Sequence, residues 1–218
     1  MNNKSYWNKK IIEWENSLKK GSNVSFVERM AAYFREPVKN RRTLCLNILK
    51  PFIKNKTVLE LGCGSGFFAS DLFKYGSPDH ITGIDISENA IKRANELSEN
   101  LYEKNKFKFM AGDANQLELP ETDVTIGLGF LDYQSPDEIK KLFSRLKSKH
   151  FLFTFSEKKV SFLRCLHLIY LYSQKCPKHF YYTKKEITDL INDNYGKLHF
   201  INKRSISFGC VVHNILDQ

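Results

Sequence analysis

Residues 57–66 constrain the fold of this chain more than any other stretch. Residues 57–61 predict a buried β-strand, and glycines then alternate with small residues at positions 62, 64 and 66. Glycine is needed where the backbone takes a positive φ or approaches a ligand closely. A helix is expected to begin near Phe67, so its free N–H groups face whatever lies above the turn. The stretch predicts a strand–turn–helix unit that binds a ligand.

A carboxylate follows the next predicted strand. This strand, residues 80–85, ends in Asp85, nineteen residues after Gly66. A carboxylate in this place suits the two hydroxyls of a ribose. Together, the glycine turn and Asp85 predict an adenosine-containing cofactor at the carboxyl ends of parallel strands.

Strand and helix patterns alternate from residue 56 onward, which predicts a parallel sheet covered on both faces. A capping box at Thr183 and Glu186 opens a late helix. The last two strands have a short connection, which predicts an antiparallel hairpin. Strands are expected at 57–61, 80–85, 107–111, 123–129, about 150–155, about 197–204 and about 208–215, and helices at 66–75, from Ser87, at 135–146 and at about 160–173.

Two helical patterns precede the first strand, at residues 5–20 and 24–52. The second is expected to break at Glu36-Pro37, because a proline disfavours helix in the residue before it. We expect residues 1–52 to form a helical lid on a core of residues 53–218. A lid insertion is expected within that core at about 156–182, and the whole chain forms a single domain.

Composition excludes several protein classes. The chain has 218 residues, 42% of them hydrophobic, which is enough for one sizeable core. No apolar run approaches the roughly 20 residues of a membrane span. The N-terminus has no signal-peptide core, and the five cysteines are scattered without metal-ligand spacing. We expect a cytoplasmic protein with reduced thiols, no membrane span and no metal.

The net charge of +10 is unevenly distributed. Residues 1–55 carry 12 Lys and Arg against 4 Asp and Glu, and residues 147–218 carry 12 against 5, whereas residues 56–146 carry 10 against 15. The basic flanks are either solvated helix faces or a positive surface for an anionic substrate, nucleic acid or membrane surface.

Residues 60–66, Glu-Leu-Gly-Cys-Gly-Ser-Gly, resemble the first motif of class I S-adenosylmethionine-dependent methyltransferases. Asp85 matches the acidic residue that ends their second strand, and Asp113-Ala114 matches the acidic–small pair after the third. The resemblance covers about residues 40–155 by motif and the remainder by topology. It implies an α/β fold: a Rossmann-like, doubly wound, seven-stranded mixed sheet with a C-terminal antiparallel hairpin, a helical N-terminal extension and a helical insertion after the fifth strand.

A dinucleotide-dependent dehydrogenase is the competing interpretation of the glycine turn. Its G-x-G-x-x-G fingerprint requires a third glycine where Phe67 stands, and it gives Asp113 no role. A purely structural turn is the other alternative, although Glu60 would then be an unusual strand residue.

The resemblance implies roles for the cofactor site. Glycines of the turn approach the methionine part of S-adenosylmethionine, Glu60 holds the loop near its amino group, and Asp85 binds the ribose. Structural alternatives are a turn-forming Asp113 and a strand-end cap at Asp85. The predicted cofactor-binding residues are Glu60, Gly62, Cys63, Gly64, Asp85, Ile86, Asp113, Ala114, Gly127 and Leu128.

The methyl acceptor is expected above the fourth and fifth strands. Asp132, Tyr133 and His167 are the candidate catalytic residues, with Asp132 or His167 as general base. A satisfied helix histidine is the alternative for His167. Basic side chains that could hold an anionic group are Lys158, Lys159 and Arg164.

The acceptor class follows from what surrounds these motifs. In the family that these motifs resemble, an N/D-P-P-Y/F tetrapeptide after the fourth strand marks methylation of planar amide or adenine nitrogens. Its absence here argues against those targets. We therefore expect methylation of a small molecule, on an oxygen of an anionic metabolite, sugar or natural-product intermediate. The alternatives are a nucleic-acid methyltransferase that uses the basic flanks, and an S-adenosylmethionine-binding protein without transferase activity.

Overall fold

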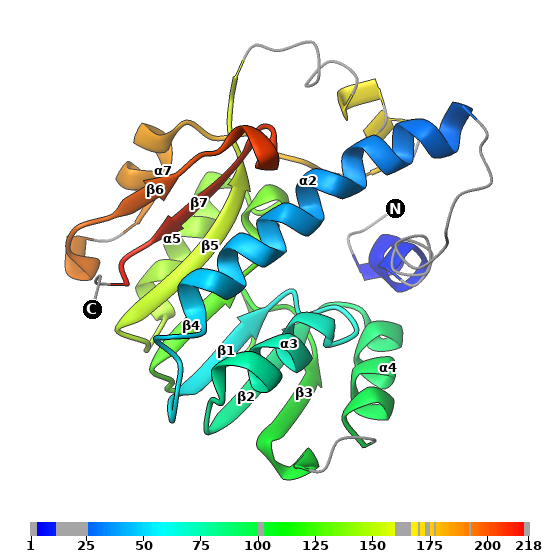
Figure 1. Cartoon of the computed structure of the whole chain (residues 1–218). Helices are drawn as coiled ribbons and strands as arrows, with labels where there is room; N and C mark the ends of the chain where they lie inside the picture. The colour runs from blue at the N-terminus through cyan, green and yellow to red at the C-terminus, as the bar shows by residue number, and fades with distance from the viewer. Residues whose placement is uncertain are drawn as a thin grey trace.

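The computed structural model describes residues 4–11, 26–99, 103–159, 167–169, 171–172, 175–176, 178–191 and 193–215. Its centre is a seven-stranded sheet with the order β3-β2-β1-β4-β5-β7-β6 (Figure 1). Strands β1 to β5 pair in parallel, and β7 pairs antiparallel with both β5 and β6, which confirms the predicted mixed sheet. The strands are β1 (Thr57–Leu61), β2 (His80–Asp85), β3 (Phe107–Ala111), β4 (Val124–Gly127), β5 (His150–Ser156), β6 (His199–Ile201) and β7 (Gly209–His213).

The strand order reverses between β1 and β4. β1 pairs with β2 on one side and with β4 on the other, so Val58 lies between Ile81 and Val124. Connections leave the two neighbours of β1 in opposite directions at such a switch point, and a crevice opens outside the carboxyl ends of the strands. The sheet therefore places the glycine turn after β1 at the edge where ligands bind in this class of fold.

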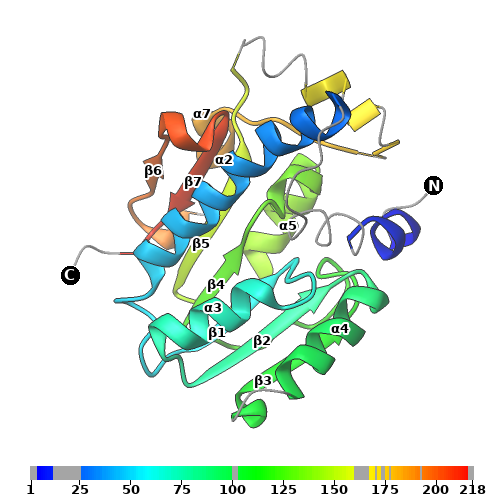
Figure 2. The same cartoon turned by 45° about the vertical axis from the view of Figure 1, so that its right-hand side comes forward.

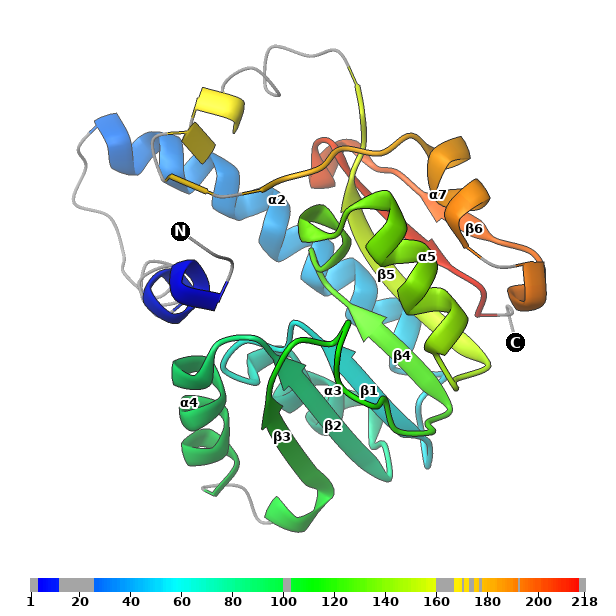
Figure 3. The ribbon, with the colours of Figure 1, turned by 180° about the vertical axis from the view of Figure 1, so that it is seen from behind.

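Helices cover both faces of the sheet, as predicted. α2 (Phe26–Leu49) and α3 (Phe67–Gly76) lie across the face seen in Figure 1, whereas α5 (Pro136–Arg145) and α7 (Lys184–Leu190) lie across the opposite face in Figure 3. α4 (Glu88–Glu99) packs against β2 and β3. Each face has its own buried apolar cluster, one that includes Leu49 and Leu72 and one that includes Phe143 and Ile187. In the described part of the chain, no helix is both long and apolar enough to cross a membrane.

The connection from β3 to β4 has no long helix. Its apolar residues Leu117 and Leu119 pack instead on the core beside α5. Arg145, in the last turn of α5, donates hydrogen bonds to the carbonyls of Ala114, Asn115 and Leu117. A single guanidinium thus fixes the loop that follows β3.

Several boundaries differ from those expected. β4 ends at Gly127, because Gly129 takes a φ of +70° and turns the chain out of the sheet. β6 covers only 199–201 of the expected 197–204, since the 3₁₀ turn Arg204–Ile206 follows it. Helix is seen over residues 4–11 of the expected 5–20, and residues 12–20 lie outside the described part. Helical turns at 167–169 and 171–172 fall within the expected helix of 160–173, whose other residues lie outside it too.

The expected break at Glu36-Pro37 is wrong. α2 continues through Pro37 from Phe26 to Leu49. A proline inside a helix removes one backbone hydrogen bond and costs about 3 kcal/mol. Packing of α2 against β7 and α3 offsets that cost, with Cys45 and Leu49 fully buried.

Replacing this proline should stabilise the protein. Pro37→Ala restores the missing N–H donor, so urea unfolding should show a free energy of unfolding higher by about 1–3 kcal/mol. Pro51→Ala is the matched control, because Pro51 follows α2 in a turn. An equal gain in both variants, or a loss in Pro37→Ala, would contradict a continuous helix.

Candidate functional site

The three glycines after β1 adopt the backbone conformation that their spacing predicted. Gly62, Gly64 and Gly66 have φ values of +69°, +54° and +74°. This left-handed region is open to glycine and costly for other residues. At Gly62 a Cβ would also lie 3.2 Å from the Phe130 ring. The turn therefore depends on glycine for its conformation and, at Gly62, for its packing.

Asp85 holds this turn in place. One carboxylate oxygen accepts a hydrogen bond from the Gly64 N–H at 2.9 Å, and the other accepts from the Ser87 N–H at 2.8 Å. The structure thus places Asp85 as a cap at the end of β2. Each oxygen has a second lone pair. Binding of ribose hydroxyls by Asp85 stays a prediction.

Glu60 is buried directly beneath the turn, with 2% of its surface exposed. Its pKa is raised to about 8, because the effect of burial is larger than the opposing effects of the nearby Arg42 and of a hydrogen bond from the Ala69 N–H. Its Oε2 atom has no hydrogen-bond partner within the described residues. A buried carboxylate oxygen of this kind suits an ammonium group. The residues present therefore fit the amino-acid end of S-adenosylmethionine.

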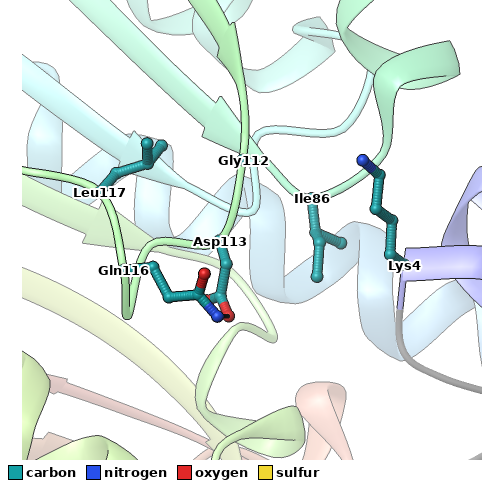
Figure 4. A pocket seen from close by; sticks show the side chains of 6 residues that line it. All are labelled: Lys4, Ile86, Gly112, Asp113, Gln116 and Leu117. Carbon is teal, nitrogen blue, oxygen red and sulfur yellow. Dashed lines mark hydrogen bonds between the residues drawn. The ribbon is translucent and has the colours of Figure 1, made fainter.

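A cavity of about 380 Å³ lies beyond the ends of β2 and β3 (Figure 4). Asp113 lies on one side of it, where its carboxylate accepts from the Asn115 N–H at 2.9 Å and from Gln116 Nε2 at 3.2 Å. Ile86 and Lys4 lie on the other side. Asp113 thus forms the turn, and the contact with the adenine amino group that the resemblance implies for it stays a prediction. The lining residues are Lys4, Ile86, Gly112, Asp113, Gln116 and Leu117.

The helix of residues 4–11 contributes Lys4 to the lining of this cavity. It lies near α4 (Figure 2). Asn8 Oδ1 accepts from Ser87 Oγ at 3.0 Å, and the Asn8 carbonyl accepts from Asn89 Nδ2 at 3.0 Å. Lys4 Nζ lies 2.6 Å from a Glu88 carboxylate oxygen. The N-terminal helix is therefore bound to the start of α4, and these contacts were not anticipated from the sequence.

The remaining predicted cofactor residues lie around the same edge. Cys63 and Ala114 are buried, and the Ala114 carbonyl is held by Arg145. A Cβ at Gly127 would lie 2.5 Å from the Phe153 ring, and Leu128 packs on the core. Contact of Gly127 and Leu128 with the cofactor stays a prediction.

Asp132 lies after β4, and it is buried with 5% of its surface exposed. Its Oδ1 atom accepts from the Ser156 N–H at 2.6 Å, and its Oδ2 atom lies 4.0 Å from Arg41 Nη1. Burial raises the pKa of Asp132 to about 6, although Arg41 and Ser156 act in the opposite direction. The carboxylate therefore links the end of β4 to the end of β5 and to α2.

Tyr133 and His167 are brought together by a residue that sequence reasoning missed, His179. The His179 ring lies 5.5 Å from Tyr133 and 5.1 Å from His167, and His167 Nδ1 is 2.7 Å from the Tyr181 hydroxyl. We name Tyr133, His167, His179 and Tyr181 the histidine–tyrosine cluster. Trp7 of the N-terminal helix covers it, 4.9 Å from Tyr133.

The two histidines of this cluster are neutral. Burial is the main cause, and it lowers the pKa of His167 to about 3 and that of His179 to about 4. Arg41 adds to the effect on both. A neutral imidazole forms hydrogen bonds readily, but one with so low a pKa is a weak proton acceptor. The role of His167 as general base stays a prediction.

Gln134 connects the two halves of the site. Its side-chain oxygen accepts from Asn115 Nδ2 at 2.6 Å, beside Asp113. Its backbone carbonyl accepts from the Tyr182 hydroxyl, next to the histidine–tyrosine cluster. The loop after β3 and the segment before α7 are therefore joined through one buried residue.

Arg41 and His179 were not predicted from the sequence, and the reason is the same for both. Arg41 was one of several basic residues on a predicted helix, and His179 carried no motif or periodicity. Only tertiary contacts place them beside Asp132 and Tyr133. Across the part of the chain that the structure describes, no three His, Cys, Asp or Glu side chains gather as a metal site.

Comparisons with known proteins agree with this arrangement. Residues 53–149 match a family model described as a methyltransferase domain. Phosphoethanolamine N-methyltransferase 1 from Triticum aestivum is 33% identical over 112 residues, which are 50% of this chain and 22% of that protein. A second wheat phosphoethanolamine N-methyltransferase is 38% identical over 112 residues, or 21% of its length. The chain thus spans about a fifth of the length of these curated relatives.

Solved structures share the fold. Magnesium protoporphyrin IX methyltransferase from Synechocystis PCC 6803, crystallised with S-adenosylhomocysteine, aligns with a TM-score of 0.68 and 18% identity over 96% of both chains. Human N-acetylserotonin methyltransferase in complex with S-adenosylmethionine aligns with a TM-score of 0.61 and 15% identity, covering 96% of this chain and 65% of that one.

The glycine turn, Asp85, Glu60 and the cavity beside Asp113 lie at one edge of the sheet, and the cofactor contacts that the resemblance implies for them stay predictions. The fold and the family match point the same way. Residues 53–149 thus match a methyltransferase domain, and the chain shares the fold of methyltransferases crystallised with S-adenosylmethionine or S-adenosylhomocysteine.

Proposed function

We propose that this protein transfers the methyl group of S-adenosylmethionine to an oxygen of a small anionic molecule. The observation that carries the proposal is the position of the helix of residues 4–11. Lys4 lines the cavity beside Asp113, and Trp7 contacts Tyr133 of the histidine–tyrosine cluster. The same short helix therefore borders both the cofactor side and a buried polar cluster, where an acceptor would lie next to the donor.

The chemistry requires alignment and exclusion of water. The cofactor supplies a methyl group that is already activated on a sulfonium, so the protein has to hold the acceptor oxygen in line with it. Neutral His167 and His179 and the hydroxyls of Tyr133 and Tyr181 offer hydrogen bonds to an acceptor hydroxyl. Asp132 is the candidate general base that accepts the proton which such an oxygen loses, because its pKa of about 6 lies close to neutral pH.

The anionic character of the acceptor has two supports. First, α2 and the segment before α7 belong to the two basic flanks of the sequence, and both reach the histidine–tyrosine cluster. Second, the wheat relatives carry the name of a phosphorylated acceptor, phosphoethanolamine. Because these relatives are named for methylation of nitrogen, amine phosphates belong in the test beside hydroxyl and carboxyl acceptors.

A methyl-transfer screen tests the proposal. The protein is incubated with S-adenosylmethionine labelled in the methyl group and with sugar acids, phosphorylated intermediates, amine phosphates and total RNA, and products are read by mass. We expect label on an oxygen of one anionic small molecule. His167→Gln should slow that transfer roughly tenfold while cofactor binding stays within twofold of wild type. Label on RNA alone would support the nucleic-acid alternative, and cofactor binding without transfer would support a non-catalytic protein.

Glu60 allows a test of the cofactor site without turnover. At pH 7 a carboxyl with a pKa of about 8 is mostly protonated, and an ammonium beside it favours the ionised form. Binding of S-adenosylhomocysteine should therefore release close to one proton, seen by calorimetry in buffers with different ionisation enthalpies. Glu60→Gln should abolish the release and weaken binding roughly tenfold. Glu121→Gln, at an exposed carboxyl, is the control, and proton release from Glu60→Gln equal to that of wild type would exclude this role.

The same carboxyl predicts how the stability of the ligand-free protein depends on pH. The folded state raises the pKa of Glu60 from 4.5 to about 8, so between these values the folded protein holds a proton that the unfolded chain has lost. Stability then falls as the pH rises through this window, by up to about 1.4 kcal/mol per pH unit from this group. Urea unfolding at pH 5 to 8 should show a shallower fall for Glu60→Gln than for wild type, and parallel curves would contradict the raised pKa.

A further inference from the structure

Arg41 extends from α2 to the edge of the sheet where the acceptor would bind. A Cβ at Gly129, just after β4, would lie 3.6 Å from Arg41 Nη2, and one at Gly209, the first residue of β7, would lie 3.5 Å from Nη1. Gly209 pairs with Ser156 at the carboxyl end of β5. The guanidinium therefore lies between two glycines, where neither neighbour has a side chain to fill the space.

The donors of Arg41 are not satisfied within the described residues. Its side chain is only 15% exposed, and its one ion pair there is the 4.0 Å approach to Asp132, which is longer than a hydrogen bond. A guanidinium has five N–H donors, and leaving buried donors without partners costs free energy. An arginine that served only to bury an ion pair would be expected to make hydrogen bonds as well.

The next residue shows what a structural arginine looks like in this protein. Arg42 donates from Nε and Nη2 to one oxygen of Asp71, at 3.0 and 2.6 Å, and from Nη2 to the Phe67 carbonyl at 2.7 Å. These bonds tie α2 to α3. Arg41 and Arg42 are adjacent on one helix, but only Arg42 has its donors bound to protein acceptors within the described residues.

Asp132 is only a partial counter-ion for Arg41. Its Oδ1 atom is occupied by the Ser156 N–H, and Oδ2 remains 4.0 Å from the guanidinium. The two histidines nearby are neutral, so they add no positive charge that would need compensation. The charge of Arg41 thus remains available to a second anion that arrives from the acceptor side.

His179 provides a second unsatisfied group in the same region. Its Nδ1 atom is buried and has no hydrogen-bond partner in the described part of the chain. Arg41 is close enough to lower its pKa, and the His179 ring lies 4.7 Å from that of Tyr181. An arginine fork beside a neutral imidazole suits a carboxylate or phosphate, because both groups present several oxygens in a small volume.

We propose that Arg41 binds an anionic oxygen group of the methyl acceptor, a carboxylate or a phosphate, and that His179 Nδ1 forms a second hydrogen bond to the same group. This inference rests on the proposed function and makes it more specific. It assigns the anionic end of the acceptor to α2, in a region where the sequence offered only a general excess of positive charge. The methylated oxygen then lies on the cofactor side of that anchor.

Calorimetric titration of small anions tests the anchor without methyl transfer. Inorganic phosphate and acetate are titrated separately into the full chain saturated with S-adenosylhomocysteine. We expect wild type to bind at least one of them, and the stronger binder identifies the group. Arg41→Met should weaken binding roughly tenfold or more, and Arg41→Lys, which keeps the charge but lacks the fork, should give an intermediate loss. His179→Phe should weaken binding by a smaller factor.

Lys54→Met is the matched control, because it removes one positive charge at an exposed site between α2 and β1. Its anion affinity should equal that of wild type, and all variants should bind S-adenosylhomocysteine within twofold of each other. If Arg41→Met does not fold by this criterion, Arg41→Lys carries the comparison. Absence of anion binding by wild type, or equal binding by wild type and the Arg41 variants, would overturn the inference.

Acceptor kinetics separate this inference from the proposed function. For an acceptor found by the screen, Arg41→Met should raise KM roughly tenfold or more for the anionic form, Arg41→Lys should raise it by a smaller factor, and both should leave KM for the neutral ester or amide unchanged. Methyl transfer that is equally fast with neutral acceptors and insensitive to Arg41 would overturn the anchor but leave the proposed function standing. Anion binding that depends on Arg41, in a protein that methylates no small molecule, would support the anchor and reject the function.

Discussion

The bonds of Asp85 to the Gly64 and Ser87 N–H groups hold the functional edge of this protein together. One carboxylate joins the glycine turn after β1 to the start of α4. Ser87 then carries the contact onward, because its hydroxyl donates to Asn8 of the N-terminal helix. The turn, the cavity wall and the covering helix therefore depend on a single side chain at the end of β2.

Much of the fold could be predicted because its signals are local. Alternating apolar runs and three spaced glycines identified the central strands and the turn, and the positive φ values of Gly62, Gly64 and Gly66 follow from the same spacing. The proline rule failed at Pro37, since packing of α2 on the sheet outweighs the local preference of one residue. Local rules thus held where no tertiary contact opposed them.

The acceptor side could be predicted only in part. Asp132 and Tyr133 were found because they follow a strand whose end was known, and His167 because it was a histidine on a predicted helix. Arg41 and His179 were missed, because their significance depends on long-range contacts: Arg41 approaches Asp132, 91 residues further along the chain, and His179 contacts Tyr133, 46 residues before it. Phe180, next to His179, donates its N–H to the Asp132 carbonyl at 2.7 Å, a pairing that no periodicity encodes. Long-range pairings of this kind cannot be predicted from local sequence patterns.

The two adjacent arginines show how one helix serves two purposes. Arg42 is bound by Asp71 and a carbonyl, and it fixes the position of α2 on α3. Because the helix is fixed there, Arg41 is carried to a defined place beside Gly129 without forming hydrogen bonds of its own to described residues. The arginine that fixes the helix and the arginine proposed to bind the acceptor are thus neighbours in sequence that contact different parts of the structure.

Gln134 has a consequence for how this protein could diverge. Its side chain supports the wall of the cavity beside Asp113 through Asn115, and its backbone supports the region of the histidine–tyrosine cluster through Tyr182. Mutations in the segment before α7 that changed the acceptor would also displace Gln134. Because Gln134 holds Asn115 as well, such mutations would disturb the proposed site of the methyl donor. New specificities should therefore arise more readily through the N-terminal helix, which contacts both regions from outside and could be exchanged without altering that internal link.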